Sequence, residues 1–260
     1  MPRVFVRPEA VGASRVRFDA AEAHHLRRVL RLRAGAVVEA TDGTGRLYTV
    51  RVAALEAEGG WGTIEARAEP ERESPCAITL AQAILKGDRM SWLVQKATEM
   101  GVARIVPMET ARVVARPAGG AGARQARWER IAREAVKQCG RVVVPAIDPP
   151  RALRDVAREI SEHDAAWVCW EGGGRALVQA AEDVGAPARL LLLIGPEGGF
   201  TAAEVALAEA AGARLVSLGP RILRAESAGL AAVALCQFLF GDLGGPRRSL
   251  APERETRGDA

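Results

Sequence analysis

The spacing of hydrophobic and polar positions changes near residue 70, which predicts that the chain has two structural parts. Before that point, short apolar runs alternate with polar residues and end at turn-forming residues, a pattern typical of half-buried β-strands. We expect strands at residues 3–6, 16–18, 36–40, 47–52 and 62–68. Because many short strands bury their apolar faces most simply by closing on one another, the first part is predicted to be a small β-barrel.

Two local signals refine this first part. Asp42 and Gly43 lie between two expected strands and predict a tight turn there. Asp19 precedes Glu22 by three residues, the spacing of a capping box, which predicts that a helix begins at this point. The first part is therefore expected to combine a barrel with one helix.

Residues 69–75 separate the two parts. They are charged, bounded by prolines and poor in apolar side chains, so they favour an extended linker over a packed element. We expect a barrel domain at residues 1–70, a linker at 71–75 and a second domain at 76–243. Residues 244–260 are polar and rich in Pro, Arg and Glu, which predicts a disordered tail.

The second part alternates apolar strands with helices. Strands are expected at residues 78–85, 104–108, 165–170 and 190–194. Helices are expected at 88–100, from about 125 to 138, at 153–160 and at 227–240, with a flexible loop at 117–122. This alternation predicts an α/β fold whose parallel sheet is covered by helices on both faces. The last helix is apolar on nearly every side, so it is predicted to be buried.

Glycine-rich turns follow the apolar runs that begin at Leu190 and Leu218. The first turn has glycines at three positions within residues 195–199, which leave backbone groups uncovered, so a flat ligand can approach closely. Thr201 and Glu204 form a second capping box, which places the start of a helix directly after this turn. On neighbouring strands, the two turns would form two walls of one site.

Basic residues outnumber acidic ones only slightly, but they gather in the first part. The chain has 36 Lys and Arg against 32 Asp and Glu, a net charge of +4. Since a local basic surface attracts phosphates of any sequence, we interpret the N-terminal cluster as an RNA-binding surface. The two adjacent histidines in it can equally cap the small domain. The candidate RNA contacts are Arg3, Arg7, His25, Arg27, Arg28 and Arg31.

Several kinds of site and location are disfavoured. The four cysteines are scattered without a C-x-x-C pair, which argues against a metal site or a disulfide framework and fits a reducing cytoplasm. No apolar run has the length of a membrane span, and arginines interrupt the N-terminal apolar patch, so we expect neither a membrane anchor nor a signal peptide. No G-x-G-x-x-G follows a strand and no G-x-x-x-x-G-K-[ST] occurs, which argues against a dinucleotide fold and an NTPase.

The two glycine-rich turns, with Arg224 and Glu226 in the second, resemble those of the ribosomal RNA small-subunit methyltransferase E family. Further matching segments follow in the same order along the chain, at residues 28–31, 42–43, 86–90, 95–101 and 138–141. Members of this family are SPOUT-superfamily enzymes that use S-adenosylmethionine to methylate N3 of a uridine in 16S rRNA of the small ribosomal subunit. The resemblance implies a PUA-like barrel, a methyltransferase domain with a trefoil knot, and a homodimer.

The resemblance also implies that three strand ends hold the cofactor. Apolar residues of these loops would form a slot for adenine, and backbone groups would bond to its edge. Glu197 can bond to the ribose or shape its own loop, and both roles stay open. The candidate cofactor-binding residues are Trp170, Glu171, Gly172, Ile194, Gly195, Pro196, Glu197, Gly198, Leu218, Gly219, Ile222 and Leu223.

For catalysis, the resemblance points to the second glycine-rich turn. Loss of the proton from uracil N3 leaves negative charge on O2 or O4, which Arg224 can stabilise. Glu226 can accept the proton or orient Arg224, and the residues do not decide between these roles. Ala225 stands where family members normally carry Thr, so a hydroxyl contact at this position is absent here.

Two other functions are compatible with the same residues. One is a different SPOUT activity, such as ribose 2′-O methylation of RNA, and the other is non-catalytic RNA binding during ribosome assembly. The small barrel and the segment from Arg224 to Glu226 match the uridine-N3 family better than the first alternative. Stabilisation by the cofactor would separate an enzyme from the second.

Overall fold

The computed structural model describes residues 1–113 and 120–245, and the chain divides into two compact units. The first unit comprises Met1–Glu73, Asp88–Ile105 and Pro117–Pro149, and the second comprises Ser74–Gly87, Val106–Arg116 and Pro150–Ala260. The chain first passes between the units at Glu73 and Ser74, then returns twice. A strictly sequential division with a linker at 71–75 stays a prediction, and the expected tail lies outside the described residues beyond Gly245.

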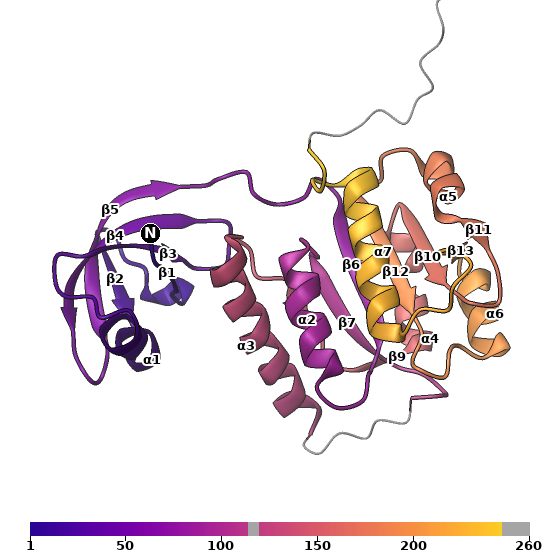
Figure 1. Ribbon diagram of the computed structural model, residues 1–260, viewed down its shortest axis with the longest axis horizontal. Coiled ribbons are helices and arrows are strands. Elements are labelled where there is room, and N and C mark those ends of the chain that lie inside the picture. Colours follow the sequence, from indigo (N-terminus) through magenta and orange to yellow (C-terminus); the bar gives the residue numbers. More distant parts are fainter. Residues whose placement is uncertain (114–119, 246–260) are drawn as a thin grey trace, which may run out of the picture. The chain divides into compact units, whose positions relative to one another are not determined.

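A five-stranded sheet forms the N-terminal part of the first unit, as the sequence predicts (Figure 1). Its order is β1-β3-β4-β5-β2, with β1 parallel to β3 and the other neighbours antiparallel. Apolar side chains from alternate strand positions, including Val4, Phe18 and Tyr48, fill its interior. The strands are β1 Arg3–Phe5, β2 Arg15–Phe18, β3 Val37–Thr41, β4 Leu47–Leu55 and β5 Gly60–Ala68.

The predicted helix of this unit begins where its cap indicates. Helix α1 (Ala20–His24) follows Asp19, whose side chain accepts a hydrogen bond of 2.9 Å from the backbone N–H of Glu22. The helix then widens into a π-helical turn, η2 (His25–Val29), which the sequence pattern does not indicate. A short 3₁₀ turn, η1 (Pro8–Ala10), precedes β2.

The turn at Asp42 is confirmed and is tied to its surroundings. The Asp42 carboxylate accepts hydrogen bonds from the Thr44 backbone N–H at 2.9 Å and from the Tyr48 hydroxyl at 2.8 Å. Burial, followed by the bond to Asp42, raises the pKa of Tyr48 above its ordinary value. A Cβ on Gly43, whose φ is +78°, would lie 2.8 Å from the Val144 side chain, so only glycine fits this turn.

Two helices complete the first unit. Helix α2 (Arg89–Glu99) packs against α3 (Ala121–Cys139), and strand β8 (Ala146–Ile147) pairs with the start of β7. The prediction of a loop at 117–122 is wrong for Ala121 and Gly122, because α3 already includes them; residues 117–119 of that prediction lie outside the described ranges. Buried Arg141 holds this part together by bonding to Glu73 at 2.6 Å and to the Thr98 carbonyl at 2.9 Å.

The second unit contains a parallel sheet, which confirms the predicted α/β fold. Its strand order is β11-β13-β10-β12-β6-β7, and β9 also pairs with β7. The pairs β10–β12, β10–β13 and β12–β6 are all parallel. The strands are β6 Ala77–Ala83, β7 Arg104–Glu109, β9 Arg151–Ala152, β10 Ala165–Cys169, β11 Arg175–Ala176, β12 Arg189–Ile194 and β13 Arg214–Ser217.

Helices cover both faces of this sheet (Figure 1). Helices α4 (Leu153–Ala157) and α6 (Ala202–Ala210) pack with Ala166 and Val168 on one face. Trp167 alternates with these residues, so its ring on the opposite face contacts Phe240 of α7, with ring centroids 5.8 Å apart. The helix expected at 153–160 is shorter than predicted, because a separate 3₁₀ turn, η3 (Ile160–Glu162), follows α4, and α5 (Leu177–Val184) lies beside β11 and β13.

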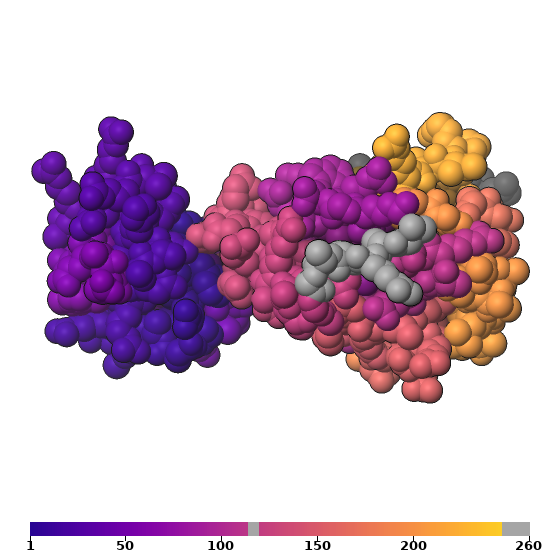
Figure 2. Space-filling view, turned by 90° about the horizontal axis from the view of Figure 1, so that it is seen from below, coloured from indigo at the N-terminus to yellow at the C-terminus, as the bar shows by residue number. Residues whose placement is uncertain are grey.

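The C-terminal helix α7 (Ala225–Phe240) packs against β6 and β12 along one side only. Leu230, Val233 and Phe240 are buried, whereas Leu235 and Phe238 are 41% and 48% exposed. The prediction that this helix is buried, and not a surface element, is therefore confirmed for its inner side and wrong for its outer stripe. Yellow C-terminal residues accordingly reach the surface in Figure 2. The strand pairings do not trace the trefoil knot, which stays a prediction.

Candidate cofactor and catalytic site

Strand register brings three glycine-containing loops to one edge of the second unit's sheet. Cys169, the last residue of β10, pairs with Ile194 at the end of β12 and with Val216 near the end of β13. The three strands are parallel, so their carboxyl ends and the loops after them lie at the same edge. A binding site at this edge is the usual arrangement in open α/β sheets.

The loop after β10 is shaped by glycine. The Trp170 ring folds over Gly172, where an added Cβ would lie 2.5 Å from the ring. Gly174, with a φ of +150°, lies against the backbone of Leu215, where an added Cβ would be within 2.7 Å. Trp170 is half-buried, and Glu171 and Gly172 are exposed. This loop therefore presents an aromatic ring, a carboxylate and bare backbone at the sheet edge.

The loop after β12 begins in the core and ends at the surface. Ile194, Gly195 and Pro196 are buried, and Glu197 and Gly198 are exposed. A Cβ on Gly195 would lie 3.2 Å from the Phe200 backbone nitrogen, a close approach that only glycine allows without movement. The capping box predicted for the next helix is present in full, between Thr201 and Glu204.

Three residues outside this loop hold it by hydrogen bonds. The Lys86 backbone N–H donates to Glu197 Oε1 at 3.2 Å, and Arg112 Nη1 donates to the Gly198 carbonyl at 2.8 Å. The buried Gln82 amide donates to the Gly195 carbonyl at 3.4 Å. The bond from Lys86 supports the loop-shaping role for Glu197.

Sequence reasoning assigned no role to Gln82, Lys86 or Arg112. The polar Gln82 in the mostly apolar strand β6, which also contains Thr79, was one available signal. Lys86 lies in the matching segment 86–90, but nothing local indicated that its backbone N–H or the Arg112 side chain supports this loop, because their partners lie 111 and 86 residues further along the chain.

The loop after β13 is the most open of the three. Gly219 has a φ of +117°, and a Cβ added there would meet no atom within 4 Å. Leu218 is half-buried, but Ile222 and Leu223 are 86% and 37% exposed. Large apolar side chains seldom remain exposed together unless they contact a ligand or partner.

These three loops fit the adenosyl group that the resemblance implies. Gly219 keeps the backbone accessible, Gly195 lets the middle loop pack closely on Phe200, and Trp170 with Ile222 and Leu223 supplies apolar surface for a flat ring. The Glu171 carboxylate packs against Gly199, which has a φ of +70°. A Cβ added to Gly199 would overlap this carboxylate, so only glycine fits here. Apolar walls with a few polar groups and uncovered backbone are the composition expected of a nucleoside pocket.

The two candidate catalytic residues stand at the start of α7, beside the third loop. Arg224 is the exposed N-cap residue, with extended backbone angles, and Glu226 is half-buried in the first turn. The N-terminus of this helix adds partial positive charge to that of the guanidinium. The region therefore favours an anion in front of Arg224.

The Cys169 thiol, at the same edge of the sheet, is unreactive. Burial raises the pKa of Cys169 to about 12, so this thiol stays protonated near neutral pH. A protonated thiol is a poor nucleophile, and Cys169 is therefore a packing residue beside the site.

The predicted RNA contacts of the first unit do not form one uniform surface. Arg3 is largely buried and its guanidinium pairs with Glu39 at 2.6 Å, an arrangement that favours a structural role. Arg7, Arg28 and Arg31 are exposed, whereas His25 and Arg27 are half-buried. Exposed arginines of η2 and the following residues are the members of this group best placed for phosphates.

Neither a metal cluster nor a membrane span is found in the described parts of the chain. Residues 1–113 and 120–245 contain no group of three or more His, Cys, Asp or Glu arranged to hold a metal ion. Within the same ranges, no helix combines the length and the apolar character needed to cross a bilayer.

Family comparisons identify both parts of the chain. A sequence model described as "RNA methyltransferase domain" matches residues 72–237, and one described as "RNA methyltransferase PUA domain" matches residues 18–64. The chain is 32% identical to the Ribosomal RNA small subunit methyltransferase E of Synechocystis over 240 residues, which cover 92% of this chain and 78% of the relative. The protein of the same name from Bacillus subtilis is 28% identical over 223 residues, covering 84% and 87%.

Solved structures agree with these relatives. A ribosomal RNA small subunit methyltransferase E from Neisseria gonorrhoeae, bound to S-adenosyl methionine, is 35% identical and superposes with a TM-score of 0.83. The similarity covers 94% of this chain and 99% of that one. A Legionella pneumophila structure with the bound cofactor SAM is 31% identical, with a TM-score of 0.84 and coverage of 93% and 98%.

Proposed function

The chain belongs to the ribosomal RNA small subunit methyltransferase E family, and we propose that it transfers the methyl group of S-adenosylmethionine to N3 of a uridine in 16S rRNA. The observation that carries this proposal is the convergence of three glycine-containing loops at one sheet edge, set by the pairing of Cys169 with both Ile194 and Val216. The two relatives of known structure at 31–35% identity hold this cofactor.

The cofactor supplies an electrophilic methyl group when it is bound. The loops after β10, β12 and β13 would hold it, with Gly195 and Gly219 contributing backbone and Trp170 and Leu218 contributing apolar surface. Lys86 and Arg112 fix the middle loop by hydrogen bonds, which lowers the cost of ordering it around a ligand.

Arg224 stabilises the negative charge that develops on the uracil oxygens as N3 loses its proton. Its exposed guanidinium stands at a helix N-terminus, where two sources of positive charge act on the same small region. Glu226, half-buried two residues further along, accepts the proton or orients Arg224.

The barrel of the first unit captures the RNA. Arg28 and Arg31 are exposed and bind phosphates, which positions the strand without reading its sequence. The substrate is an assembled small subunit, because RNA is recognised largely by its shape and by unstacked single-stranded bases.

The decisive test uses small ribosomal subunits from a strain that lacks this protein. Incubation with the purified protein and S-adenosylmethionine is expected to produce N3-methyluridine, measured by nuclease digestion and mass spectrometry of the nucleosides. Omission of the cofactor should abolish the product. A 2′-O-methylated nucleoside would contradict the proposed base specificity, and the absence of any methylated product would favour a non-catalytic role.

We extend the proposal to assembly and location. The protein acts as a homodimer in the cytoplasm, where its substrate is made. The outer stripe of α7 offers an apolar surface to a second copy, since Leu235 and Phe238 are exposed and Leu243 beyond the helix is 40% exposed. In a two-fold symmetric dimer, the same surface patch of each subunit forms the contact, so one apolar stripe per chain is sufficient.

Sedimentation at micromolar concentration is therefore expected to report about twice the chain mass of 27.6 kDa. The substitution Phe238→Arg should shift the protein to a monomer, because it places a charge in the apolar contact. Leu207→Arg is the matched control, since Leu207 is a 42% exposed apolar residue on α6, and it should leave the dimer intact. A wild-type protein that is monomeric and fully active would refute the homodimer.

A further inference from the structure

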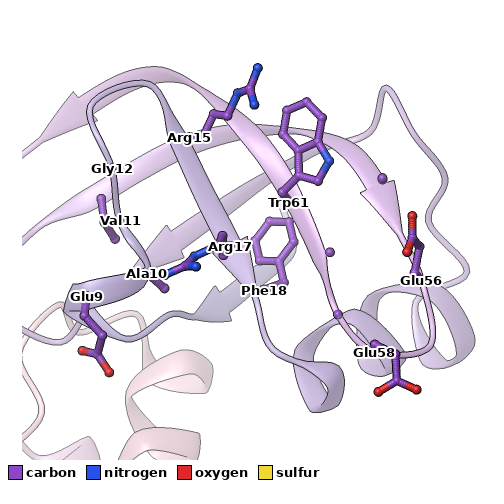
Figure 3. A pocket seen from close by; sticks show the side chains of 13 residues that line it. Glu9, Ala10, Val11, Gly12, Arg15, Arg17, Phe18, Glu56, Glu58 and Trp61 are labelled. Atoms are coloured by element: carbon purple, nitrogen blue, oxygen red, sulfur yellow. The ribbon is translucent and has the colours of Figure 1, made fainter.

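A groove of about 660 Å³ lies on the first unit, and none of the candidate cofactor, catalytic or RNA-contact residues lines it (Figure 3). Three segments line it: residues 9–12 around η1, strand β2, and the hairpin between β4 and β5. Its volume is within the range of pockets that bind small ligands. Strand β2 is at the edge of the sheet, and Val11 of the preceding segment forms a bridge with its Val16.

Trp61 and two arginines occupy the centre of this groove. Trp61 pairs directly with Arg17 across β5 and β2, and Arg15 lies two residues from Arg17, so all three side chains point outward from the same face. The Arg15 guanidinium stacks over the Trp61 ring, 4.5 Å from the ring centre. Both arginines are exposed and the indole is half-buried. The groove thus presents a stacked pair of planar groups to the solvent.

These arginines differ from the other arginines of the barrel strands. Arg3 of β1 and Arg51 of β4 each pair with a glutamate, and Arg67 of β5 donates to the carbonyls of Gly12 and Ala13. Within residues 1–113 and 120–245, neither Arg15 nor Arg17 forms an ion pair with a carboxylate. Their positive charge is therefore available to an anionic partner such as a phosphate.

Three carboxylates stand at the two ends of the groove. Figure 3 places Glu9 on one side of the stacked pair, and Glu56 and Glu58 on the other. Carboxylates repel a bare phosphate chain, so this arrangement is unsuited to indiscriminate binding of RNA. They accept hydrogen bonds from the N–H groups of a base, as glutamate does from an amino group in base recognition.

We propose that this groove binds one unstacked guanine of the rRNA strand, a recognition site that rests on the proposed function. The base stacks on the Trp61–Arg15 pair, and Arg17 contacts a flanking phosphate. Guanine carries two adjacent donors, N1–H and the 2-amino group, which match the two oxygens of a single carboxylate from Glu56 or Glu58. Bases of single-stranded RNA are commonly recognised by stacking on aromatic and guanidinium planes combined with hydrogen bonds to their edges.

The test compares short RNA probes on the full-length protein. Three seven-nucleotide uridine strands carry guanosine, inosine or uridine at the centre, and affinity is measured by fluorescence anisotropy. Guanosine should bind about 5-fold more tightly than inosine, which lacks the 2-amino donor. Trp61→Ala should weaken guanosine binding about 10-fold, whereas Trp61→Phe keeps a stacking ring and should lose much less.

Variants with neutral glutamine side chains separate recognition of the base from general electrostatic attraction of the RNA. The double substitution Glu56→Gln and Glu58→Gln should abolish the preference for guanosine over inosine by weakening guanosine binding, while leaving or raising affinity for the uridine probe. Arg15→Gln, a surface change that spares the strand backbone, provides a second stacking variant if Trp61→Ala fails to fold. Thermal unfolding verifies folding of every variant.

Equal affinity for guanosine and inosine, or a Trp61→Ala variant that binds like the wild type, would overturn the proposal. So would tighter binding of an arginine-rich peptide that the glutamine variants lose, because the groove would then be a protein-docking surface. If the wild-type protein methylates small subunits but binds guanosine no more tightly than inosine, only the proposed guanine site is refuted. Selective guanosine binding without any methylation refutes the proposed function alone.

Discussion

Replacing Arg224 with alanine is expected to slow methyl transfer by about 100- to 1,000-fold, the usual effect of removing one group that stabilises a developing oxyanion. Arg224 is exposed at the N-terminus of α7, so its loss leaves no buried charge and should not unfold the protein. The effect should appear in the rate of a single turnover with subunits and cofactor both saturating. Under these conditions, differences in binding no longer contribute.

Two comparisons make this result specific. Arg158→Ala removes another exposed arginine of the second unit, on the segment after α4, and should leave the rate unchanged. Arg224→Ala should bind small subunits and S-adenosylhomocysteine as tightly as the wild type. A single-turnover rate equal to that of the wild type would show that Arg224 has no catalytic role.

Gly219→Val is expected to weaken binding of S-adenosylmethionine by about 10- to 100-fold, the range that forced overpacking produces. A Cβ at Gly219 meets no protein atom within 4 Å, so the new side chain would occupy space left for the ligand. Its φ of +117° also strains a branched residue, which would distort the loop. Calorimetry with S-adenosylmethionine and S-adenosylhomocysteine measures the change.

The matched control isolates the ligand from the strain. Gly185, at the end of α5, also has a positive φ, +67°, and also has open space around its missing Cβ. Gly185→Val should therefore lower the unfolding temperature in a similar way but keep wild-type affinity for the cofactor. If Gly219→Val binds the cofactor normally, the loop after β13 does not belong to the pocket.

The sequence by itself determined the features that depend on neighbouring residues. The caps at Asp19 and Thr201 act within one helical turn, and both helices begin where these residues indicate. The alternating pattern located all five barrel strands, and the change of period located the parallel sheet. The glycine-rich loops were evident for the same reason, because a turn depends on its own few residues.

Only the tertiary structure decided which distant groups meet. Arg3 reads as part of a basic cluster, yet its guanidinium pairs with Glu39 across two strands. The outer stripe of α7 is exposed although its sequence is apolar all round, since a single sheet face covers only one side of a helix. The hydrogen bonds from Lys86 and Arg112 to the middle glycine loop join residues separated by 111 and 86 positions. Such contacts depend on strand order and register, which local propensity does not encode, so the support of the candidate site became visible only in the folded chain.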